Sequence, residues 1–546
     1  MKHIQDKKLK KILLDLDTEN INESSFNSYN ELSDNSFIDY LLKNNIASYK
    51  LISNILHDHF FINSYKLDIE NISAEAIDSF DIKTVGRYSF LPFSIEKDKI
   101  QIATSNPFDH QMHDNLRLLS GKEIEVFFSK PKDIKSFINH FYNLNEIDSL
   151  VQEFKNNNVS GDVDNSPVVK ILDILINDAV LVNASDIHIE PAETTLRVRF
   201  RIDGALKHQR NIDKQISQNI VSRLKIMSGM EISTTRKPQD GHFKHDNIEN
   251  IDFRVSTLPV IFGEKVVIRL IYSQGLIFDL EKNNLEFFED DIETIKLLLR
   301  NSTGIVLVTG ATGSGKTTTL SSFVSYLKHE SVNIITLEDP VENIIDGVNQ
   351  VTIDKKSDLY FDKILENLLR QDPDIIMVGE IRDSETAKTA MRSALTGHLV
   401  LATLHTNDAL SSVIRLIDLG VKSYLVTSIV RGIISQCLVR KLCSHCKEKV
   451  VIPDHMAQYL NIEQGTYIYE KRGCKSCFKT GYKGRLAIYE ILVMNNKVKI
   501  LMDQKMSFER IKEILVEDGM VTIRDNAIKQ LLKGNTSLEE ILKVTM

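Results

Sequence analysis

The chain has 546 residues, of which 42% are hydrophobic and 26% are charged, and its formal net charge is −8 at pH 7. This length predicts several domains, and the composition is that of a globular protein. The net negative charge gives no overall basic footprint for nucleic acid. Residues 1–20 are too polar for a signal peptide, and no apolar run approaches the roughly 18–20 residues that span a bilayer. We therefore expect a cytoplasmic protein.

The first part of the sequence predicts a leader followed by a small domain. Residues 1–35 are rich in Lys, Asn, Asp and Ser, and we expect a mobile leader with one short helix. Residues 36–142 mix helical and strand patterns, including a strand at 100–103 and a closing helix at 133–142. Because we recognise no catalytic grouping there, we interpret 36–142 as a docking or regulatory domain.

Composition changes divide the remaining chain. A polar stretch at 143–167 predicts a flexible linker, and a middle domain follows at 168–272. A second, shorter linker is expected at 273–285. The largest predicted domain then occupies 286–546.

Arginines recur on the predicted strands of the middle domain. Residues 196–203 alternate apolar and cationic side chains, so one face carries Arg197, Arg199 and Arg201. This face is either the solvated side of a half-buried strand or an anion-binding surface, and the sequence leaves both interpretations open. Two further arginines, Arg254 and Arg269, lie on other strand-like runs.

The stretch 304–317 carries the strongest functional signal. An apolar run at 305–309 predicts a buried strand, which is followed by Gly310-x-x-x-x-Gly315-Lys316-Thr317 and then by a helix. Glycines let backbone N–H groups turn toward phosphate oxygens, while Lys reaches the outer phosphates and Thr can ligate Mg²⁺. The expected nucleotide-binding residues are Gly310, Ala311, Thr312, Gly313, Ser314, Gly315, Lys316, Thr317 and Thr318.

Three later apolar runs, 334–337, 375–378 and 399–404, are each followed by acidic residues or histidine. In a parallel sheet, ligand-binding residues lie at the carboxyl ends of the strands. ATP hydrolysis needs a carboxylate that orients the attacking water and another in the metal shell. The candidate catalytic residues are Glu342 and Glu380. His398 and His405 bracket the last run, and the strand-end rule favours His405.

Five cysteines occur, and four form two CxxC pairs. Cys443 and Cys446 form the first pair, and Cys474 and Cys477 form the second. Two such pairs can complete the tetrahedral Cys₄ shell of a structural Zn²⁺, which leaves no open position for catalysis. The fifth cysteine lies in the apolar stretch 428–439, which we predict to be a buried helix.

The sequence LRQDPDIIMVGEIRD at 369–383 resembles the signature of the type II secretion and type IV pilus assembly ATPases. The resemblance extends over about residues 80–545. Four motifs carry it: 310–317 is similar to the Walker A loop, 335–342 to the acidic box, 375–380 to the Walker B strand and 396–408 to the histidine box. The acidic box places Glu342 at the position of the catalytic glutamate.

The resemblance implies an α/β fold with a RecA-like P-loop domain. A PAS-like α+β middle domain and a small α/β N-terminal domain would precede it, and a zinc sub-domain would be inserted at 440–480. The family implies a cytoplasmic homohexamer at the inner membrane, with a platform protein and a membrane-anchored protein that binds the N-terminal domain. ATP hydrolysis would turn the middle domain against the ATPase domain and drive pilin assembly. Arg254 and Arg269 match family arginines that close over the γ-phosphate.

One departure and two alternatives accompany this interpretation. The Arg-Leu-Gly leader helix with which some members bind cyclic di-GMP is not evident in residues 1–60, so we expect no cyclic di-GMP site. The main alternative is a nucleic-acid-dependent P-loop ATPase with a zinc ribbon, which the charge and the lack of a basic, aromatic-rich stripe disfavour. A retraction motor is the other, although that subgroup usually lacks the long N-terminal domain and the four cysteines.

Overall fold

The computed structural model divides the chain into two compact units. The first comprises 1–241, 255–269 and 474–479, and the second comprises 242–254, 270–473 and 480–546. The described residues are 2–15, 26, 36–44, 46–67, 72–142, 146–156, 166–246, 248, 250–272, 280, 285–353, 361–474, 477, 479–504 and 506–545. In these ranges, no helix is long and apolar enough to cross a bilayer.

Three helices share a small core at the N-terminus: α1 (Lys2–Asp15), α2 (Phe37–Lys43) and α3 (Tyr49–Phe60). The short helix expected in the leader is therefore present. Leu9 and Leu13 of α1 are fully buried, so residues 2–15 pack into a core and the prediction of mobility is wrong for them. Of the remaining leader, only Phe26 lies within the described residues.

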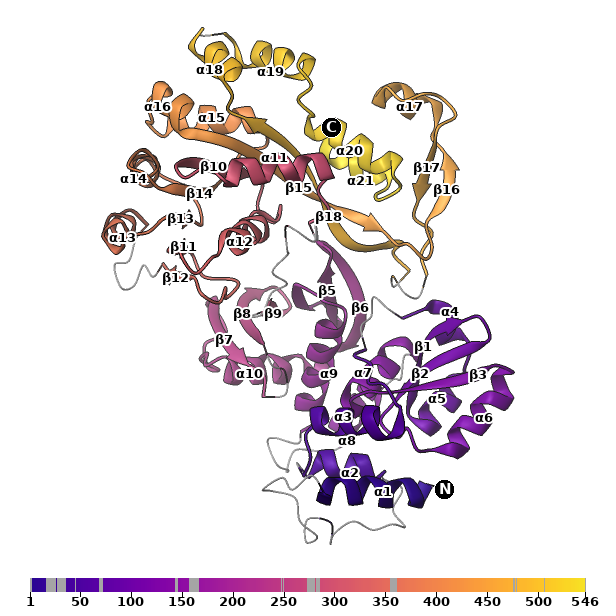
Figure 1. Cartoon of the computed structure of the whole chain (residues 1–546). Helices are drawn as coiled ribbons and strands as arrows, with labels where there is room; N and C mark the ends of the chain where they lie inside the picture. Colours follow the sequence, from indigo (N-terminus) through magenta and orange to yellow (C-terminus); the bar gives the residue numbers. More distant parts are fainter. Residues whose placement is uncertain are drawn as a thin grey trace. The chain divides into compact units, whose positions relative to one another are not determined.

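A three-stranded sheet with the order β1-β2-β3 follows (Figure 1). Strand β2 pairs antiparallel with β1 and parallel with β3. The expected strand at 100–103 and helix at 133–142 lie within β2 and α7. The elements are α4 (Ala74–Asp78), α5 (Ile82–Tyr88), β1 (Phe90–Glu96), β2 (Lys99–Thr104), α6 (His110–Ser120), β3 (Glu123–Phe128) and α7 (Pro131–Tyr142).

The predicted linker at 143–167 contains helix α8 (Glu146–Asn156). Ile147, Leu150 and Val151 are buried, and their spacing places them on one helical face. The prediction of a flexible linker is therefore wrong for this helix, which packs against α9 (Pro167–Leu181). Residues 143–145 and 157–165 lie outside the described part of the chain, as do residues 273–285 of the second linker apart from Leu280 and Leu285.

The middle of the chain forms a six-stranded sheet with the order β6-β5-β4-β9-β8-β7. Along β5 the apolar residues are buried and the arginines alternate with them, as the sequence predicts. The elements are β4 (Asp186–Pro191), β5 (Thr195–Ile202), β6 (Ala205–Asp213), η4 (Lys214–Ile216), α10 (Ser217–Met227), β7 (Gln239–Lys244), β8 (Ile251–Val260) and β9 (Gly263–Tyr272).

A seven-stranded sheet with the order β12-β11-β13-β14-β10-β15-β18 forms the centre of the second unit. Its strands pair in parallel from β12 to β15, and β18 pairs antiparallel with β15. Hydrophobic cores cover both faces, and helices pack on each (Figure 1). Burial on both faces explains why strands such as β10 and β14 are continuous apolar runs.

The strands of this sheet are β10 (Gly304–Thr309), β11 (Ile334–Glu338), β12 (Asn349–Thr352), β13 (Ile375–Val378), β14 (Leu399–Leu404), β15 (Val430–Leu442) and β18 (Tyr482–Val493). Helix α11 (Glu289–Leu299) precedes the first of these strands. The helical elements between the strands are α12 (Lys316–Leu327), α13 (Phe361–Leu368), η6 (Leu369–Gln371), α14 (Ser384–Leu395), α15 (Ala409–Asp418) and α16 (Ser423–Ile429).

Strand β15 corrects another prediction. Residues 430–439, which we expected to be helical, belong to this strand, and Cys437 pairs with Ile488 of β18. An apolar run buried on both sides looks alike in a strand and in a core helix. The remaining elements are β16 (Glu448–Val451), α17 (Asp454–Leu460), β17 (Tyr467–Glu470), α18 (Asn496–Asp503), α19 (Phe508–Glu517), α20 (Ile523–Leu532) and α21 (Leu538–Thr545).

Candidate functional site

The glycine-rich loop joins β10 to α12 at the carboxyl edge of the seven-stranded sheet. Gly310 has a φ of 145°, and a Cβ there would lie 2.2 Å from the backbone oxygen of Gln436. Gly315 has a φ of 87° and forms the N-cap of α12. Glycine is therefore required at both ends of the loop, because other residues rarely adopt these conformations.

Lys316 lies at the first position of α12 and is buried. Its Nζ donates hydrogen bonds to the carbonyl oxygens of Gly310 and Ala311, each at 2.9 Å. Burial lowers the pKa of Lys316, and the negative charge of Glu380 acts in the opposite direction. The lysine ammonium is thus held against its own loop and lies within the field of a carboxylate.

The other predicted loop residues surround this lysine. Ala311, Thr312 and Gly313 are exposed, whereas the side chain of Ser314 is buried. Thr317 and Thr318 are half-buried in the first turn of α12. The loop N–H groups and the N-terminus of α12 are suited to bind phosphate. The hydroxyl group of Thr317 can ligate Mg²⁺.

Glu380 and His405 come together beside this loop. Glu380 follows β13 and His405 follows β14, and His405 Nε2 lies 3.4 Å from Glu380 Oε2. The other carboxylate oxygen of Glu380 forms an ion pair of 2.6 Å with Arg382. The strand order places β14 between β13 and β10, so one sheet edge carries the carboxylate, the histidine and the glycine-rich loop.

His398 lies at the opposite edge, as the strand-end rule predicts. Its backbone oxygen accepts a hydrogen bond of 3.1 Å from Gly304 N, at the start of β10. Its Nδ1 lies 2.8 Å from the backbone oxygen of Ser393.

The acidic residues after β11 differ in environment. Glu338 is buried, and its Oε1 accepts hydrogen bonds from Thr336 Oγ1 at 2.7 Å and Gln350 Nε2 at 3.0 Å. Glu342 lies four residues beyond β11, in the loop that leads to β12, and is exposed. The structure thus groups Glu380 with His405 and Lys316, while the catalytic role of Glu342 remains a prediction from sequence.

Gln350 holds the loop that contains Glu342, a role that we did not predict from the sequence. Its Nε2 also donates to the Asn343 carbonyl oxygen at 2.9 Å, and its Oε1 accepts from Ile345 N at 2.7 Å. One side chain on β12 therefore fixes the backbone on the C-terminal side of Glu342. Local sequence carries no signal for these contacts.

Three of the five predicted arginines of the middle domain form ion pairs with carboxylates on β4. Arg269 Nε lies 3.0 Å from Asp186 Oδ1, and Arg201 Nε lies 3.5 Å from the other oxygen of the same buried aspartate. Arg199 pairs with Glu190 at 2.7 Å. These contacts define an ion-paired face for Arg199 and Arg201.

Arg197 and Arg254 project from the same sheet and are exposed. The alternating pattern Asp-Ile-His-Ile-Glu at 186–190 was the sequence signal for the carboxylates on β4, because it complements the arginine pattern of β5. The pairing of these two strands was not predicted from the sequence.

The four cysteines of the CxxC pairs form one cluster, as predicted. Their sulfur atoms all lie within 4.8 Å of one another, and the Sγ atoms of Cys474 and Cys477 are 3.7 Å apart. A tetrahedral zinc with Zn–S bonds of about 2.3 Å requires sulfur atoms about 3.8 Å apart. The N–H of Gly473 also points at Cys446 Sγ, 3.3 Å away, as is suitable for a thiolate. This donor set fits zinc.

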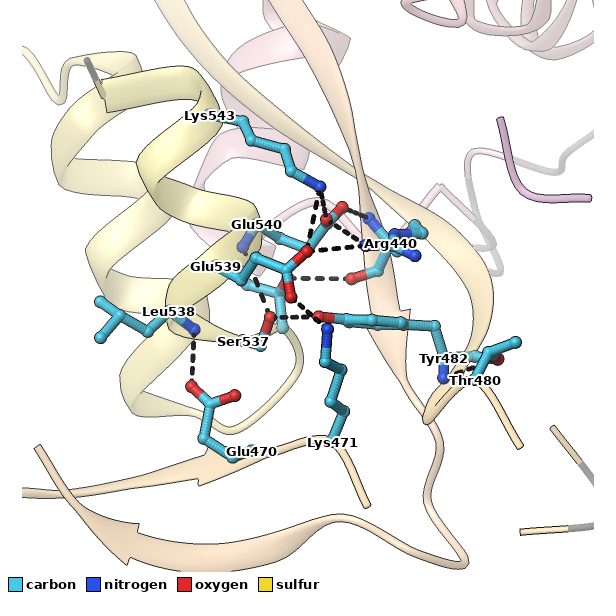
Figure 2. Close-up of polar contacts among 11 residues, drawn as sticks. Arg440, Glu470, Lys471, Thr480, Tyr482, Ser537, Leu538, Glu539, Glu540 and Lys543 are labelled. Carbon is cyan, nitrogen blue, oxygen red and sulfur yellow. Dashed lines mark hydrogen bonds and ion pairs between the residues drawn. The ribbon is translucent and has the colours of Figure 1, made fainter. Parts of the chain in front are cut away.

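A polar cluster joins the C-terminal helix to the strands beside the cysteines (Figure 2). Glu540 of α21 accepts hydrogen bonds from Arg440 Nη2 at 2.7 Å and from Arg440 N at 2.9 Å, and it also pairs with Lys543. The Arg440 guanidinium lies 3.9 Å from the ring centre of Tyr482, whose hydroxyl contacts Ser537 Oγ at 2.7 Å. Residues 537–543 thus attach α21 to β15 and β18.

Comparison with known proteins identifies the family. Residues 162–543 match the family described as Type II/IV secretion system protein, and residues 62–147 match the MshEN domain. The chain belongs to the type II/IV secretion system protein family. Within that family it is an ATP-hydrolysing enzyme of the secretion and pilus-assembly group.

The similar proteins include type IV pilus assembly ATPases and type II secretion system proteins. The type IV pilus assembly ATPase TfpB of Acinetobacter baylyi is 37% identical over 512 residues, which cover 89% of this chain and 86% of that protein. A type II secretion system protein E of Xanthomonas campestris is 36% identical, with 86% and 85% covered. The type IV pilus assembly ATPase PilB of Thermus thermophilus is 38% identical over 84% of this chain, which spans about half of that longer protein (53%).

Solved structures support the fold. The X-ray structure of the Legionella pneumophila ATPase DotB aligns with a TM-score of 0.52 at 22% identity, covering 69% of this chain and 95% of that one. The corresponding DotB structure from Yersinia pseudotuberculosis aligns with a TM-score of 0.51 at 20% identity, covering 71% and 95%. At these identities the likeness concerns the fold alone.

Proposed function

We propose that this ATPase powers assembly of a type IV pilus or of a type II secretion pseudopilus. The family relationship supports the class of machine, since relatives of both kinds align over most of the chain. The observation that carries the chemistry is the pairing of Glu380 with His405 beside the glycine-rich loop that holds Lys316. The relatives do not favour the nucleic-acid-dependent alternative.

In this proposal each residue at the sheet edge has a distinct task. Lys316 and the loop N–H groups neutralise the charge of the ATP phosphates, and the Thr317 hydroxyl would ligate Mg²⁺. Bound Mg²⁺ would supply further phosphate neutralisation. Glu342 accepts a proton from the attacking water, while Glu380 and His405 orient polar groups around the γ-phosphate.

The mechanical part of the proposal requires several subunits. We infer a homohexamer in which Arg254 and Arg269 of a PAS-like middle domain close over the γ-phosphate at a RecA-like ATPase domain. The ion pair with Asp186 supports this role for Arg269, because it orients a guanidinium group that solvent can reach. The Arg269 side chain is 68% exposed. Hydrolysis would then turn the two domains against each other.

The N-terminal domain gives the proposal its membrane connection. We infer that it docks on a membrane-anchored protein, and that the ATPase binds an inner-membrane platform protein from the cytoplasm. The MshEN match at 62–147 supports a family-specific role for this domain. We still predict no cyclic di-GMP site, and a saturable calorimetric signal with that dinucleotide would contradict this prediction.

We also propose that the four clustered cysteines hold a structural zinc. Their spacing, burial and N–H contacts support four thiolate ligands. Such a closed shell would stabilise the module between β15 and β18 without taking part in hydrolysis.

The proposed function is tested in the source organism. Replacing the chromosomal copy with Lys316→Ala removes a phosphate-neutralising charge, so surface pili or secreted substrate should be lost. Immunoblots must show normal protein levels, and a wild-type copy in trans should restore the phenotype. Normal piliation and normal secretion with Lys316→Ala would contradict the proposal.

A further inference from the structure

A buried glutamine on the neighbouring strand contacts the phosphate loop from behind. Gln436 lies on β15 and is 2% exposed. Its Nε2 donates to the Ser314 carbonyl oxygen at 2.8 Å, and its Oε1 accepts from Thr319 Oγ1 at 3.0 Å. One side chain thus joins the loop to the first turns of α12. We propose that Gln436 is a positioning residue that holds the loop in its phosphate-binding conformation, an inference that rests on the proposed nucleotide site.

The chemistry of the two partners fixes the orientation of the amide. A backbone carbonyl can only accept a hydrogen bond, so the NH₂ group of Gln436 must face Ser314. The Thr319 hydroxyl then donates to the amide oxygen. The side chain therefore satisfies a buried carbonyl and a buried hydroxyl together, which neither a hydrocarbon nor a carboxylate of the same length can do.

The hydrogen bond from Gln436 to the Ser314 carbonyl also sets the direction of the next N–H group of the loop, that of Gly315. In a planar trans peptide, the C=O of Ser314 and the N–H of Gly315 point in opposite directions. Because Gln436 fixes the carbonyl on the β15 side, the Gly315 N–H is turned to the other side of the loop, where phosphate-binding N–H groups are needed.

The backbone of Gln436 acts on the other end of the same loop. Its carbonyl oxygen lies 2.2 Å from the position that a Cβ on Gly310 would take. A Cβ on Gly315 would lie 3.2 Å from the Gln436 Nε2. Both end glycines of the loop therefore pack directly on this one residue, and a change in its position displaces the loop at both ends.

The test compares matched variants of the full-length protein. Gln436→Met keeps the length and removes both hydrogen bonds, whereas Gln436→Glu keeps an acceptor for Thr319 but places a carboxylate against the Ser314 carbonyl. Gln530→Met on α20 is the control, because Gln530 is also 2% exposed and its Oε1 accepts from Asn535 at 2.7 Å. Binding of fluorescent Mg·ADP, steady-state ATP hydrolysis and thermal melting are measured for each.

We expect Gln436→Met to weaken nucleotide binding and raise KM by about tenfold. Of the two hydrogen bonds that it removes, the one to the Ser314 carbonyl holds the loop, and the loss of one buried hydrogen bond has about this effect. Its kcat should change far less, because loop contacts to phosphate exist before and during the reaction. Gln436→Glu should bind nucleotide more weakly still, and Gln530→Met should bind like wild type even if it melts earlier.

Two results would overturn the inference. If Gln436→Met bound nucleotide within twofold of wild type and only melted earlier, Gln436 would be a core residue without a positioning role, and the proposed function would stand. If the wild-type protein and Gln530→Met bound no nucleotide, both the proposed function and this inference would fail.

Discussion

The charged side chains at the carboxyl edge of the seven-stranded sheet have fixed partners, some in their own loop or strand and some on a neighbouring strand. Lys316 donates to two carbonyls of its own loop, Glu380 lies between His405 and Arg382, and the buried Glu338 accepts from Thr336 and Gln350. Such fixed partners allow charged groups to act without reorganisation when the phosphate is attacked.

The catalytic carboxylate can be tested directly at this scale. Glu342→Gln should retain ATP binding but lose at least about 10²-fold in kcat, because an amide cannot accept a proton from water. Glu385→Gln on α14, which changes an exposed residue of the pair with Lys388, is a surface control. Hydrolysis at the wild-type rate by Glu342→Gln would refute its assignment as the base.

The sequence predicted some of these residues better than others. Glu380 and His405 follow apolar runs, so the strand-end rule placed them at one edge before their contact was known. Gln350 acts through a hydrogen bond to a neighbouring strand, and Asp186 acts through an ion pair to a neighbouring strand. Such pairing depends on sheet order, which the local pattern does not contain.

At the level of elements, the cysteine cluster and the helix beside it are separate devices for stabilising one end of β15 and β18. The sulfur atoms of the four clustered cysteines lie within 4.8 Å of one another and would be joined by the proposed zinc, whereas Glu540 joins α21 to Arg440. The zinc content of the protein reports on the cysteine cluster, and the pH dependence of melting reports on the Glu540 ion pairs.

Cys474→Ser should lower the zinc content and the yield of folded protein. A serine hydroxyl remains protonated and is a poor zinc ligand, so three thiolates would remain. Zinc is measured by atomic absorption in the purified protein. Cys437→Ser is the matched control and should retain full zinc, because this half-buried thiol lies outside the cluster. Equal zinc in wild type and Cys474→Ser would exclude the Cys₄ site.

Glu540 predicts a pH-dependent contribution to stability. Burial opposes ionisation of Glu540, but the hydrogen bonds and charges of Arg440 and Lys543 outweigh it and lower the pKa to about 2. A group whose pKa falls on folding stabilises the fold above its unfolded pKa of about 4.3. That stabilisation, about 1–3 kcal/mol, is lost as the pH falls from about 4.3 toward 2.

Calorimetric melting of Glu540→Gln beside wild type tests this contribution. The variant should melt earlier at pH 7, and the difference should shrink at pH 3, because this pH lies below the unfolded pKa and only part of the stabilisation remains. Glu513→Gln, which changes an exposed pair with Arg510, should show little effect at either pH. A melting difference that did not depend on pH would contradict the role of the ion pairs.

Two element predictions failed for related reasons. The apolar run of β15 has the length of a short helix, and only its pairing with β10 and β18 reveals a strand. Helix α8 was hidden by the polar residues between Ile147, Leu150 and Val151, although these three residues already lie at helical spacing. In both stretches tertiary packing decided between two local possibilities.

At the scale of the whole molecule, the proposal links a nucleotide site in the second unit to arginines that the sequence places in the middle domain. Within the six-stranded sheet, one buried carboxylate of β4, that of Asp186, pairs with both Arg269 and Arg201. If the arginines close over the nucleotide only in the assembled oligomer, turnover per chain should rise with chain concentration until the oligomer is saturated.

The most direct test measures phosphate release from Mg·ATP by the purified, zinc-loaded protein over a range of chain concentrations, with Lys316→Ala as the blank. We predict hydrolysis that rises with concentration to a plateau in the wild type and is abolished in the variant. An oligomeric wild-type protein that neither binds nor hydrolyses ATP at any concentration would contradict the account.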